Sequence, residues 1–408
     1  MKAILVIADG LGGRPTDVDG RTCLQTAQTP NIDALAERGA VGLMDPIGPG
    51  VRPGSDVAHL SIFGYDPYNE YPGRGVFEAV GVGLDVQPGD VCFRTNFATV
   101  DEGFVVQDRR AGRIESGQPE LEQALEKLDL GDDVEVVFKT STEHRGALIL
   151  RGPGLSAAIT EADPHEPDQT VWEVRPTDHS QEAARTADLV NGLIRQSHEI
   201  LNDLPLNRTR QQDGKPPANV ILPRGAAAAP HFQTLPEKYG IQGSVIGGGA
   251  LYIGIGKLLG LEHRPVEGAT GGLDTNIMNK ADAAIEELQA KDFVFLHMKG
   301  TDSAGHDHNA EAKIGFIGRV DEAVGRIVDH LDWGETHLAF TGDHCTPIVY
   351  GDHTSEPVPI MFAGPNVLTD DVKTFSEATA QRGGLGRFSG RVVPMLAGYS
   401  NWLKKYGA

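Results

Sequence analysis

Cysteine and basic residues are scarce in this sequence. Only three cysteines occur among 408 residues, and Cys23, Cys92 and Cys345 lie far apart. An odd number of widely spaced cysteines argues against a disulfide framework, so we expect a reducing, cytoplasmic environment. Lys and Arg number 36 against 57 Asp and Glu, which gives a formal net charge of −21. This charge would repel the phosphates of nucleic acid, so we expect no nucleic-acid partner.

Long hydrophobic runs are also missing. No run reaches the roughly 18 apolar residues that a membrane-spanning helix needs, so we expect no membrane span. The opening residues, MKAILVIADG, contain a short apolar run without a cleavage site, and we interpret them as a strand. The chain is long enough for two to three domains, and the sequence leaves the oligomeric state undetermined.

Apolar runs that end in polar residues recur near the start, middle and end of the chain. Residues 2–8, 292–300 and 336–344 have the composition of buried parallel strands, and residues 358–364 form a fourth such run. Open α/β sheets bind ligands at the carboxyl ends of their strands. The sequence therefore predicts an α/β domain with a mostly parallel sheet flanked by helices, and a site at one edge of that sheet.

The middle of the chain differs in texture. Beyond about residue 85, alternating segments at 91–100, 103–107, 134–139 and 146–152 indicate a half-exposed sheet. The polar, proline-bearing stretch 204–218 is typical of a linker or surface loop. We therefore predict a core domain from residues 1–81 and 218–408, with an α+β domain inserted at 82–217.

The predicted strand ends and one Gly/Pro loop present carboxylates, imidazoles and a hydroxyl. Such donors suit Mn²⁺ or Zn²⁺, and seven of them are too many for one ion with open positions. Two ions would fit, and two-metal sites recur in phosphoryl transfer. Asp307, His308, Asp352 and His59 are interpreted as ordinary polar residues. The candidate ligands are Asp9, Ser55, Asp302, His306, Asp343, His344 and His353.

Ser55 is placed where a glycine-bearing loop enters a predicted helix. Backbone N–H groups at such a position can face an anion, and a hydroxyl on a dication loses its proton more easily. Ser55 is therefore a candidate nucleophile. The alternative is a plain N-cap serine with no chemical role.

Several motifs together resemble the archaeal-type cofactor-independent phosphoglycerate mutases, which are alkaline phosphatase-like metalloenzymes. These motifs are Asp9-Gly10, PGSDVAHLSIFGYDP (53–67), KGTDSAGHD (299–307), TGDHCTP (341–347) and YGDHTSEPVPI (350–360). They span almost the whole chain in the order found in the family.

The resemblance implies a reaction that interconverts 3-phosphoglycerate and 2-phosphoglycerate without 2,3-bisphosphoglycerate, in glycolysis and gluconeogenesis. Ser55 would become phosphoserine. The resemblance implies one ion on Asp302, His306 and His353, and a second on Asp9, Ser55, Asp343 and His344. Such enzymes generally use Mn²⁺, with Zn²⁺, Co²⁺ or Mg²⁺ as alternatives.

A mutase must also retain the glycerate and exclude water, so the inserted domain is expected to act as a lid with cations for the substrate. Asp108 resembles the acid/base position of the family, and His144 is a phosphate or acid/base candidate. The substrate-binding candidates are Arg109, Arg113, Arg145, Arg224 and Lys257. An arginine run is also common on a solvated face.

Two alternatives to the mutase stay open. One is another phosphohydrolase or phosphomutase of the alkaline phosphatase superfamily that acts on a small phosphorylated metabolite. The other is a metal-binding protein without catalysis.

Overall fold

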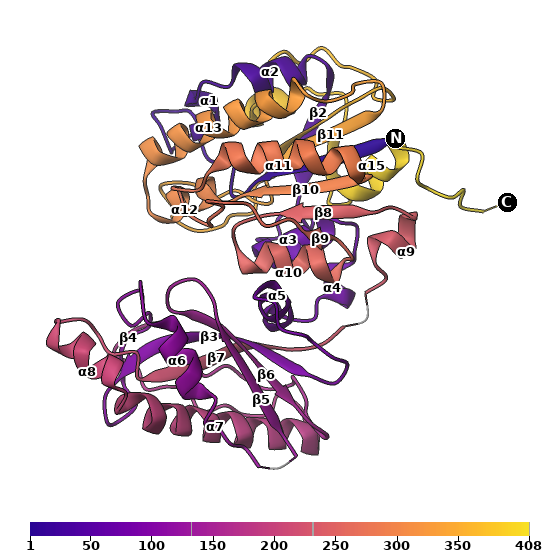
Figure 1. Cartoon of the computed structure of the whole chain (residues 1–408). Coiled ribbons are helices and arrows are strands. Elements are labelled where there is room, and N and C mark those ends of the chain that lie inside the picture. Colours follow the sequence, from indigo (N-terminus) through magenta and orange to yellow (C-terminus); the bar gives the residue numbers. More distant parts are fainter. Residues whose placement is uncertain (132, 231, 408) are drawn as a thin grey trace. The chain divides into compact units, whose positions relative to one another are not determined.

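The computed structural model describes residues 1–131, 133–230 and 232–407, and these divide into two compact units (Figure 1). Unit 1 consists of Met1–Tyr71 and Phe232–Ala408, and unit 2 is Pro72–His231. The boundaries differ from the predicted insert 82–217 because a helix before residue 82 and a strand after residue 217 both pack within unit 2.

Unit 1 is built on one eight-stranded sheet in the order β13-β2-β12-β11-β1-β10-β8-β9. The predicted α/β class is confirmed. Its strands are β1 (Lys2–Ala8), β2 (Gly39–Asp45), β8 (Gly243–Ile246), β9 (Glu262–His263), β10 (Phe293–Met298), β11 (Thr336–Thr341), β12 (Val358–Ala363) and β13 (Gly386–Ser389).

The helices of unit 1 include long amphipathic helices and short one-turn segments. They are α1 (Cys23–Thr26), α2 (Pro30–Ala36), α3 (Ser55–Ile62), α4 (Pro67–Glu70), α9 (Leu235–Tyr239), α10 (Ala250–Leu258), α11 (Ile277–Ala290), α12 (Gly300–His306), α13 (Ala310–Val328), α14 (Glu377–Ala380) and α15 (Val392–Tyr399). Within the described ranges, none of the helices combines the length and apolar character that crossing a bilayer requires.

Strand direction explains why polar residues collect at one edge of this sheet. Strand β1 pairs in parallel with β10 and β11, so the carboxyl ends of all three strands meet at one edge. Strand β12 runs antiparallel to β11. The chain therefore enters β12 at the edge where β11 ends, and residues just before Val358 reach the same edge as those after Ala8.

Helices cover both faces of the sheet. Ile4 and Val6 of β1 belong to a fully buried cluster with residues of α2, α11 and α13. On the other face, Phe295 meets Phe63, the residue that follows α3, edge to face at 5.1 Å between ring centroids. His297 stacks there on Tyr252 of α10. Strand residues that alternate along β10 thus serve two separate cores.

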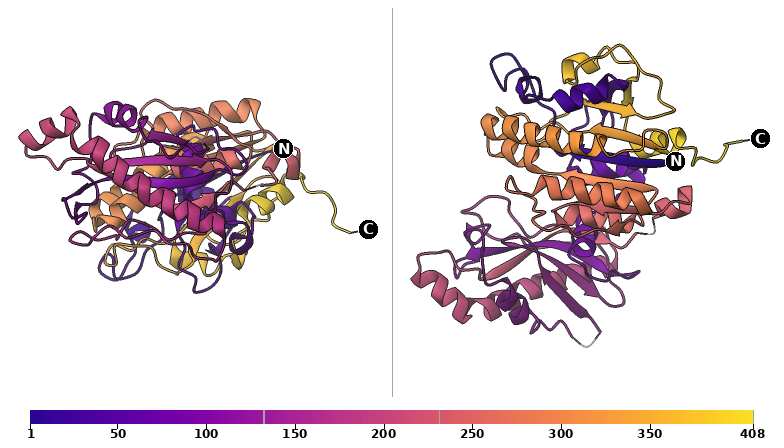
Figure 2. Two further views of the ribbon diagram at one scale, coloured as in Figure 1. Left: turned by 90° about the horizontal axis from the view of Figure 1, so that it is seen from below. Right: turned by 45° about the horizontal axis from the view of Figure 1, so that its top comes forward.

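Unit 2 contains a five-stranded antiparallel sheet in which β3 pairs with β4, β6 and β7, and β6 pairs with β5. The long helix α7 lies along this sheet (Figure 2) and shares its hydrophobic core. The elements are α5 (Arg74–Gly81), β3 (Val91–Val100), β4 (Val106–Asp108), α6 (Gln118–Leu125), β5 (Glu135–Thr140), β6 (Arg145–Arg151), α7 (Gln181–Asn202), α8 (Pro205–Gln212) and β7 (Val220–Ala228).

The prediction of a linker or loop at 204–218 was wrong in its first half, which is helix α8. Pro205 occupies the first turn, where a missing N–H costs nothing. The helix is polar, so it lacks the apolar periodicity that sequence patterns detect. Buried Asn207 holds it in place by donating to the carbonyls of Leu201 and Ala218, both at 2.8 Å.

Helix α5 approaches β3 closely because of one glycine. A Cβ on Gly75 would lie 2.2 Å from the carbonyl oxygen of Cys92 and 2.8 Å from that of Gly225. Only glycine allows this contact. It brings the polar side chains of α5 against the face of β3 that carries Arg94.

Phe340 of β11 gives a direct test of the core of unit 1. It is fully buried and meets Phe375 at 5.4 Å between centroids. Phe340→Ala should lower the free energy of unfolding by about 3–5 kcal/mol, through lost burial and a cavity. Urea unfolding of the metal-free protein measures this. Leu368→Ala is the control, since Leu368 is 89% exposed. A loss below about 1 kcal/mol for Phe340→Ala would contradict the packing described.

Candidate active site

Polar residues from distant parts of the chain converge at the carboxyl edge of the unit 1 sheet. Asp9 directly follows β1, Asp302 lies on α12 just after β10, and Asp343 follows β11. All three carboxylates are at most 2% exposed. Gly10 permits this crowding, because a Cβ there would lie 2.8 Å from the Cα of Asp302 and its φ is +65°.

Three predicted residues surround one imidazole nitrogen of a fourth, His344. His344 Nε2 lies 3.1 Å from Ser55 Oγ, 3.4 Å from Asp9 Oδ1 and 3.2 Å from Asp343 Oδ2. Ser55 is the first residue of α3, and the N-cap is Gly54. The alternative of Ser55 as a plain N-cap is therefore wrong: its hydroxyl faces His344 instead of a backbone N–H.

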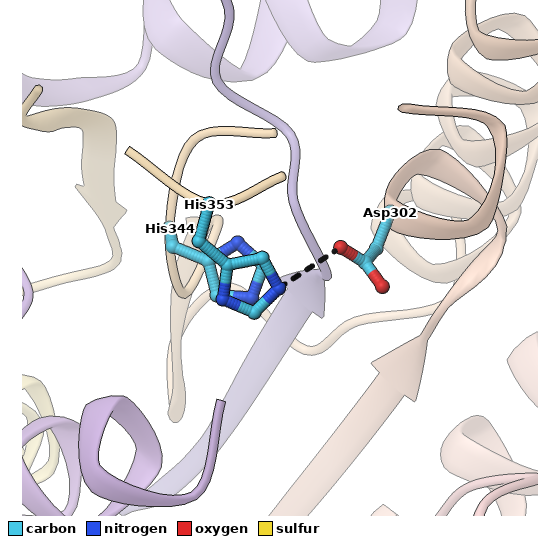
Figure 3. A group of neighbouring side chains, drawn as sticks. All are labelled: Asp302, His344 and His353. Carbon is cyan, nitrogen blue, oxygen red and sulfur yellow. Dashed lines mark ion pairs between the residues drawn. The ribbon is translucent and has the colours of Figure 1, made fainter. Parts of the chain in front are cut away.

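The other three predicted ligands form a second group. Asp302 Oδ1 lies 3.3 Å from His306 Nε2 and 3.5 Å from His353 Nε2, and the two imidazole nitrogens are 3.3 Å apart. His353 stacks on His344 at 3.5 Å between ring centroids, which joins the two groups. Figure 3 shows the two stacked rings facing Asp302.

Hydrogen bonds orient the two imidazoles of the second group. His306 Nδ1 lies 2.9 Å from the carbonyl oxygen of Gly351, and His353 Nδ1 lies 2.9 Å from that of Pro53. A carbonyl only accepts, so each Nδ1 carries a proton, and Nε2 is the nitrogen left to meet a cation. Such partners of a ligand's second nitrogen are typical of metal-binding histidines.

Thr346 fixes the third imidazole and touches both groups. Its hydroxyl donates to Asp302 Oδ1 at 2.9 Å and lies 3.1 Å from His344 Nδ1. A hydroxyl has one proton, so Thr346 accepts from Nδ1–H and leaves Nε2 of His344 unprotonated. Buried Lys313 supports this loop by donating to the Thr346 carbonyl at 2.8 Å.

The carboxylates of the two groups carry more negative charge than the neighbouring lysine balances. Burial and the charge of Asp9 raise the pKa of Asp343 well above its usual range. Burial would also raise the pKa of Asp9, but Lys299 and His297 outweigh it and hold that pKa below its usual range. Asp302 raises the pKa of His306 to about 9. The crowded carboxylates thus favour protonation of Asp343 and His306, and a bound divalent cation could replace these protons.

These residues fit divalent cations. Asp9 Oδ1 and Asp343 Oδ2 are buried and have no hydrogen-bond partner among the described residues. An unpaired buried carboxylate oxygen is costly unless a cation or donor meets it. Ligand atoms converge in the groups Asp9–Asp343–His344 and Asp302–His344–His353.

Asp352 and His59, interpreted from sequence as ordinary polar residues, both lie at this edge. Asp352 converges with His306 and His353, but it also pairs with Arg52. His59 is fully buried, and its Nδ1 lies 2.6 Å from the carbonyl oxygen of Ser55. His59 thus fixes the first turn of α3, which carries the serine.

A second polar cluster lies within unit 2, on the face of β3 that α5 covers. Arg94 and Asn96 alternate along β3, and the pairing register puts Arg224 of β7 beside Arg94 and Arg145 of β6 beside Asn96. Arg94 Nε, Arg224 Nε and Asn96 Oδ1 are buried without a hydrogen-bond partner among the described residues. Buried polar atoms left unpaired in this way indicate a place for a ligand or water.

Two buried carboxylates, Asp163 and Glu78, form ion pairs with the arginines of this cluster. Asp163 accepts two bonds from Arg109, at 2.9 Å from Nε and 2.6 Å from Nη2, and lies 3.8 Å from Arg224 Nε. Glu78 of α5 pairs with Arg74 at 3.0 Å and with Arg94 at 3.7 Å. Neither carboxylate was singled out from the sequence.

The arginines of this cluster outnumber its acids. Burial, and next the charge of Arg74, lower the pKa of Arg94 well below its usual range. Burial likewise lowers the pKa of Arg145 and of Arg224. Charged groups that are buried with like charges favour an anion among them, and guanidinium groups suit carboxylate or phosphate.

The remaining predicted residues of unit 2 differ in their surroundings. His144 is 3% exposed and lies 3.7 Å from Glu143. Arg113 lies 3.9 Å from the same Glu143. Both oxygens of Asp108 accept local backbone N–H groups, from Arg110 at 2.7 Å and Gly112 at 3.1 Å.

Lys257 is a residue of α10 in unit 1. It is exposed near the C-terminal end of α10, five residues beyond Tyr252, whose hydroxyl contacts Asp9. A substrate role for Lys257 stays a prediction from sequence, as does an acid/base role for Asp108.

Comparison with known proteins identifies the family. The chain is 46% identical to a 2,3-bisphosphoglycerate-independent phosphoglycerate mutase of Methanococcus aeolicus, over all of both chains. This chain belongs to the 2,3-bisphosphoglycerate-independent phosphoglycerate mutase family. The model of that family matches residues 36–207, and the model of type I phosphodiesterases and nucleotide pyrophosphatases matches residues 167–357. The resemblance noted from the motifs is confirmed.

Solved structures agree with this family assignment. The PH0037 protein of Pyrococcus horikoshii is 38% identical, with a TM-score of 0.85 over 100% of this chain and 99% of that one. A cofactor-independent phosphoglycerate mutase of Thermoplasma acidophilum is 35% identical, with a TM-score of 0.69 over 98% of this chain and 100% of that one.

His144 provides a pH-dependent test of unit 2. Burial, and then the charges of Arg145 and Arg110, lower the pKa of His144 to about 3. Its ring should therefore stay neutral from pH 8 to pH 5, whereas the unfolded chain binds a proton there below about pH 6.5. The unfolded state therefore gains protons, and the free energy of unfolding falls, as the pH drops below about 6.5. Above that pH this residue causes no such loss.

Histidine-selective NMR across this range checks the expectation. His144→Asn identifies the signal by its disappearance, and the same variant should lose less stability between pH 7 and pH 5 than the parent protein. A His144 signal that titrates near pH 6.5 would show that the ring is not held as described.

Proposed function

We propose that this enzyme interconverts 3-phosphoglycerate and 2-phosphoglycerate through a phosphoserine at Ser55, with two divalent metal ions and without 2,3-bisphosphoglycerate. The position of the Ser55 hydroxyl carries the proposal: it lies 3.1 Å from His344 Nε2, beside carboxylate oxygens that have no hydrogen-bond partner in the described part of the chain. Family membership supports the same reaction.

The ligand groups support a division of the metal ions. Asp9, Ser55, Asp343 and His344 would hold one ion, and Asp302, His306 and His353 the other. When bound, such ions lower the pKa of a coordinated hydroxyl and neutralise charge on a transferring phosphoryl group. The mixed oxygen and imidazole donors are compatible with Mn²⁺, which we propose as the metal used.

The chain's own residues then account for the transfer. Ser55 loses its proton, and its oxygen forms a bond to phosphorus as the bond to the C3 oxygen of 3-phosphoglycerate breaks. The released C3 oxygen takes up a proton. After the glycerate reorients, its C2 hydroxyl loses a proton and attacks the phosphoserine, the Ser55 oxygen leaves and regains a proton, and 2-phosphoglycerate forms. The N-terminal position of Ser55 on α3 directs backbone N–H groups toward the phosphoryl group.

Unit 2 is proposed to bind the anionic groups of the substrate. Arg74, Arg94, Arg109, Arg145 and Arg224 face two buried carboxylates, Glu78 and Asp163. This excess of positive charge supports binding of a carboxylate or phosphate. His144 and Arg113, which lie near Glu143, are proposed as further contacts to the substrate.

The matching phosphodiesterase model favours one alternative, a phosphohydrolase of the same superfamily. A hydrolase would transfer the phosphoryl group from Ser55 to water and release phosphate. The substrate-retaining arginines of unit 2 weigh against this alternative. We further propose a glycolytic or gluconeogenic role in the cytoplasm, where the three buried, unpaired cysteines would stay reduced.

Ser55→Ala should lower mutase activity at least about a thousandfold, because the variant has no oxygen to accept the phosphoryl group. The measurement is an enolase-coupled assay on 3-phosphoglycerate with Mn²⁺ present and 2,3-bisphosphoglycerate absent. Ser61→Ala, on the same helix and equally buried at 6%, is the matched control and should stay within about threefold of the parent.

Mass spectrometry of the parent protein, quenched during turnover, should locate phosphate on Ser55. Phosphate found only on another residue would overturn the proposed nucleophile. Release of phosphate without any 2-phosphoglycerate would favour the hydrolase.

Removal of divalent metal should abolish activity, because the proposed ligand groups then hold protons instead of cations. The test is dialysis against a chelator followed by titration with Mn²⁺, which should restore activity with saturation. Full activity of a protein shown by elemental analysis to contain no metal would refute the proposed metal requirement.

A further inference from the structure

Tyr252 and Lys299 lie between the two ligand groups and have no part in the proposed reaction so far. Lys299 Nζ lies 2.6 Å from Asp302 Oδ2, 3.2 Å from Asp9 Oδ2 and 3.0 Å from the Tyr252 hydroxyl. The Tyr252 hydroxyl lies 2.5 Å from Asp9 Oδ2. A tyrosine and a lysine thus join one carboxylate from each group.

Each carboxylate of the site uses its two oxygens differently. Asp302 turns Oδ1 toward His306 and His353, whereas its Oδ2 meets Lys299. Asp343 turns Oδ2 toward His344, whereas its Oδ1 accepts the N–H of Gly10 at 2.9 Å.

Asp9 follows the same division. Its Oδ1 faces His344 and has no hydrogen-bond partner among the described residues, whereas its Oδ2 accepts from Tyr252. In Asp9 and Asp343 one oxygen is anchored and the other points at His344, whereas Asp302 Oδ1 also accepts the Thr346 hydroxyl. Asp9 Oδ2 lies 3.2 Å from His297 Nε2 as well. The hydrogen bond from the Tyr252 hydroxyl to Asp9 can be removed by deleting a single oxygen atom.

The direction of the bonds around Tyr252 follows from their chemistry. Lys299 has only donors, so it donates to the Tyr252 oxygen. The single hydroxyl proton of Tyr252 is then left for Asp9 Oδ2.

The ring of Tyr252 is itself held rigidly. It is 2% exposed and stacks on His297 at 3.4 Å between centroids, with 18° between the planes. His297 belongs to the central strand β10. The position of the hydroxyl is therefore set by the sheet and not by the ligand groups.

We propose that Tyr252 is a positioning residue that holds Asp9 in its ligating orientation and, through Lys299, ties it to Asp302. The proposal rests on the two-metal site of the proposed function. A carboxylate with one oxygen fixed presents the other to a cation without first losing rotational freedom. Tyr252→Phe removes the hydroxyl, keeps the ring stacked on His297 and changes no charge.

Tyr252→Phe should weaken binding of at least one Mn²⁺ ion about ten- to a hundredfold. Isothermal calorimetry and Mn²⁺ electron paramagnetic resonance on the full, metal-stripped chain measure the affinity. The Mn²⁺ concentration that gives half-maximal mutase activity should rise by a similar factor. Tyr399→Phe is the matched control, because Tyr399 also stacks on a histidine, His337, near the amino-terminal end of β11, and it should leave the affinity unchanged.

The outcomes separate this proposal from the proposed function. Unchanged Mn²⁺ affinity in Tyr252→Phe, with the parent protein binding Mn²⁺, would overturn the positioning role alone. A weakened Mn²⁺ affinity in Tyr252→Phe, together with a parent protein that forms no phosphoserine, would support the positioning role and overturn the proposed reaction. A parent protein that binds no Mn²⁺ would overturn both. Thermal unfolding of the metal-free variant should match the parent within about 3 °C, which excludes general misfolding as the cause.

Discussion

Crowding of negative charge is the constraint on which unit 1 depends. Asp9, Asp302 and Asp343 are buried together, and Lys299 is in direct contact with only two of them. Three carboxylates held this closely repel one another unless cations neutralise them. The sheet that brings them together therefore makes this edge suited to divalent cations, and the imidazoles of His306, His344 and His353 are the further ligands that we propose.

The strand pattern made most of this edge predictable. Asp9, Asp302 and Asp343 follow apolar runs, and parallel strands bring such positions together whatever their distance in sequence. His353 also reaches the edge, although it precedes a strand, because β12 runs antiparallel to β11. The sequence alone does not give that direction. His353 was nevertheless a candidate, because it was collected with the other polar residues near the ends of the predicted strands.

Residues that act through burial were not predictable. Tyr252 and His297 read as ordinary core residues of a helix and a strand, since nothing local shows that they stack on each other. Arg94 and Glu78 meet only when α5 packs against β3. For the same reason, the sequence placed α5 and β7 in the core domain, whereas the structure groups them with unit 2. Both elements pack on β3, and sequence periodicity does not reveal such partners.

The insertion of unit 2 has a consequence for how the protein is made. The central strand β1 pairs with β10 and β11. Ala3 therefore gains its strand partners only after Phe293 and His337 have been synthesised. Until those residues are synthesised, one of the most apolar segments of the chain has no strand partner. Pairing across so long a loop is slow, and an unpaired apolar strand invites association with other chains. Unit 2 has all its own strands within one continuous stretch, so it can fold while the first strand of unit 1 is still waiting. The order of synthesis thus makes the inserted unit the first to acquire a core.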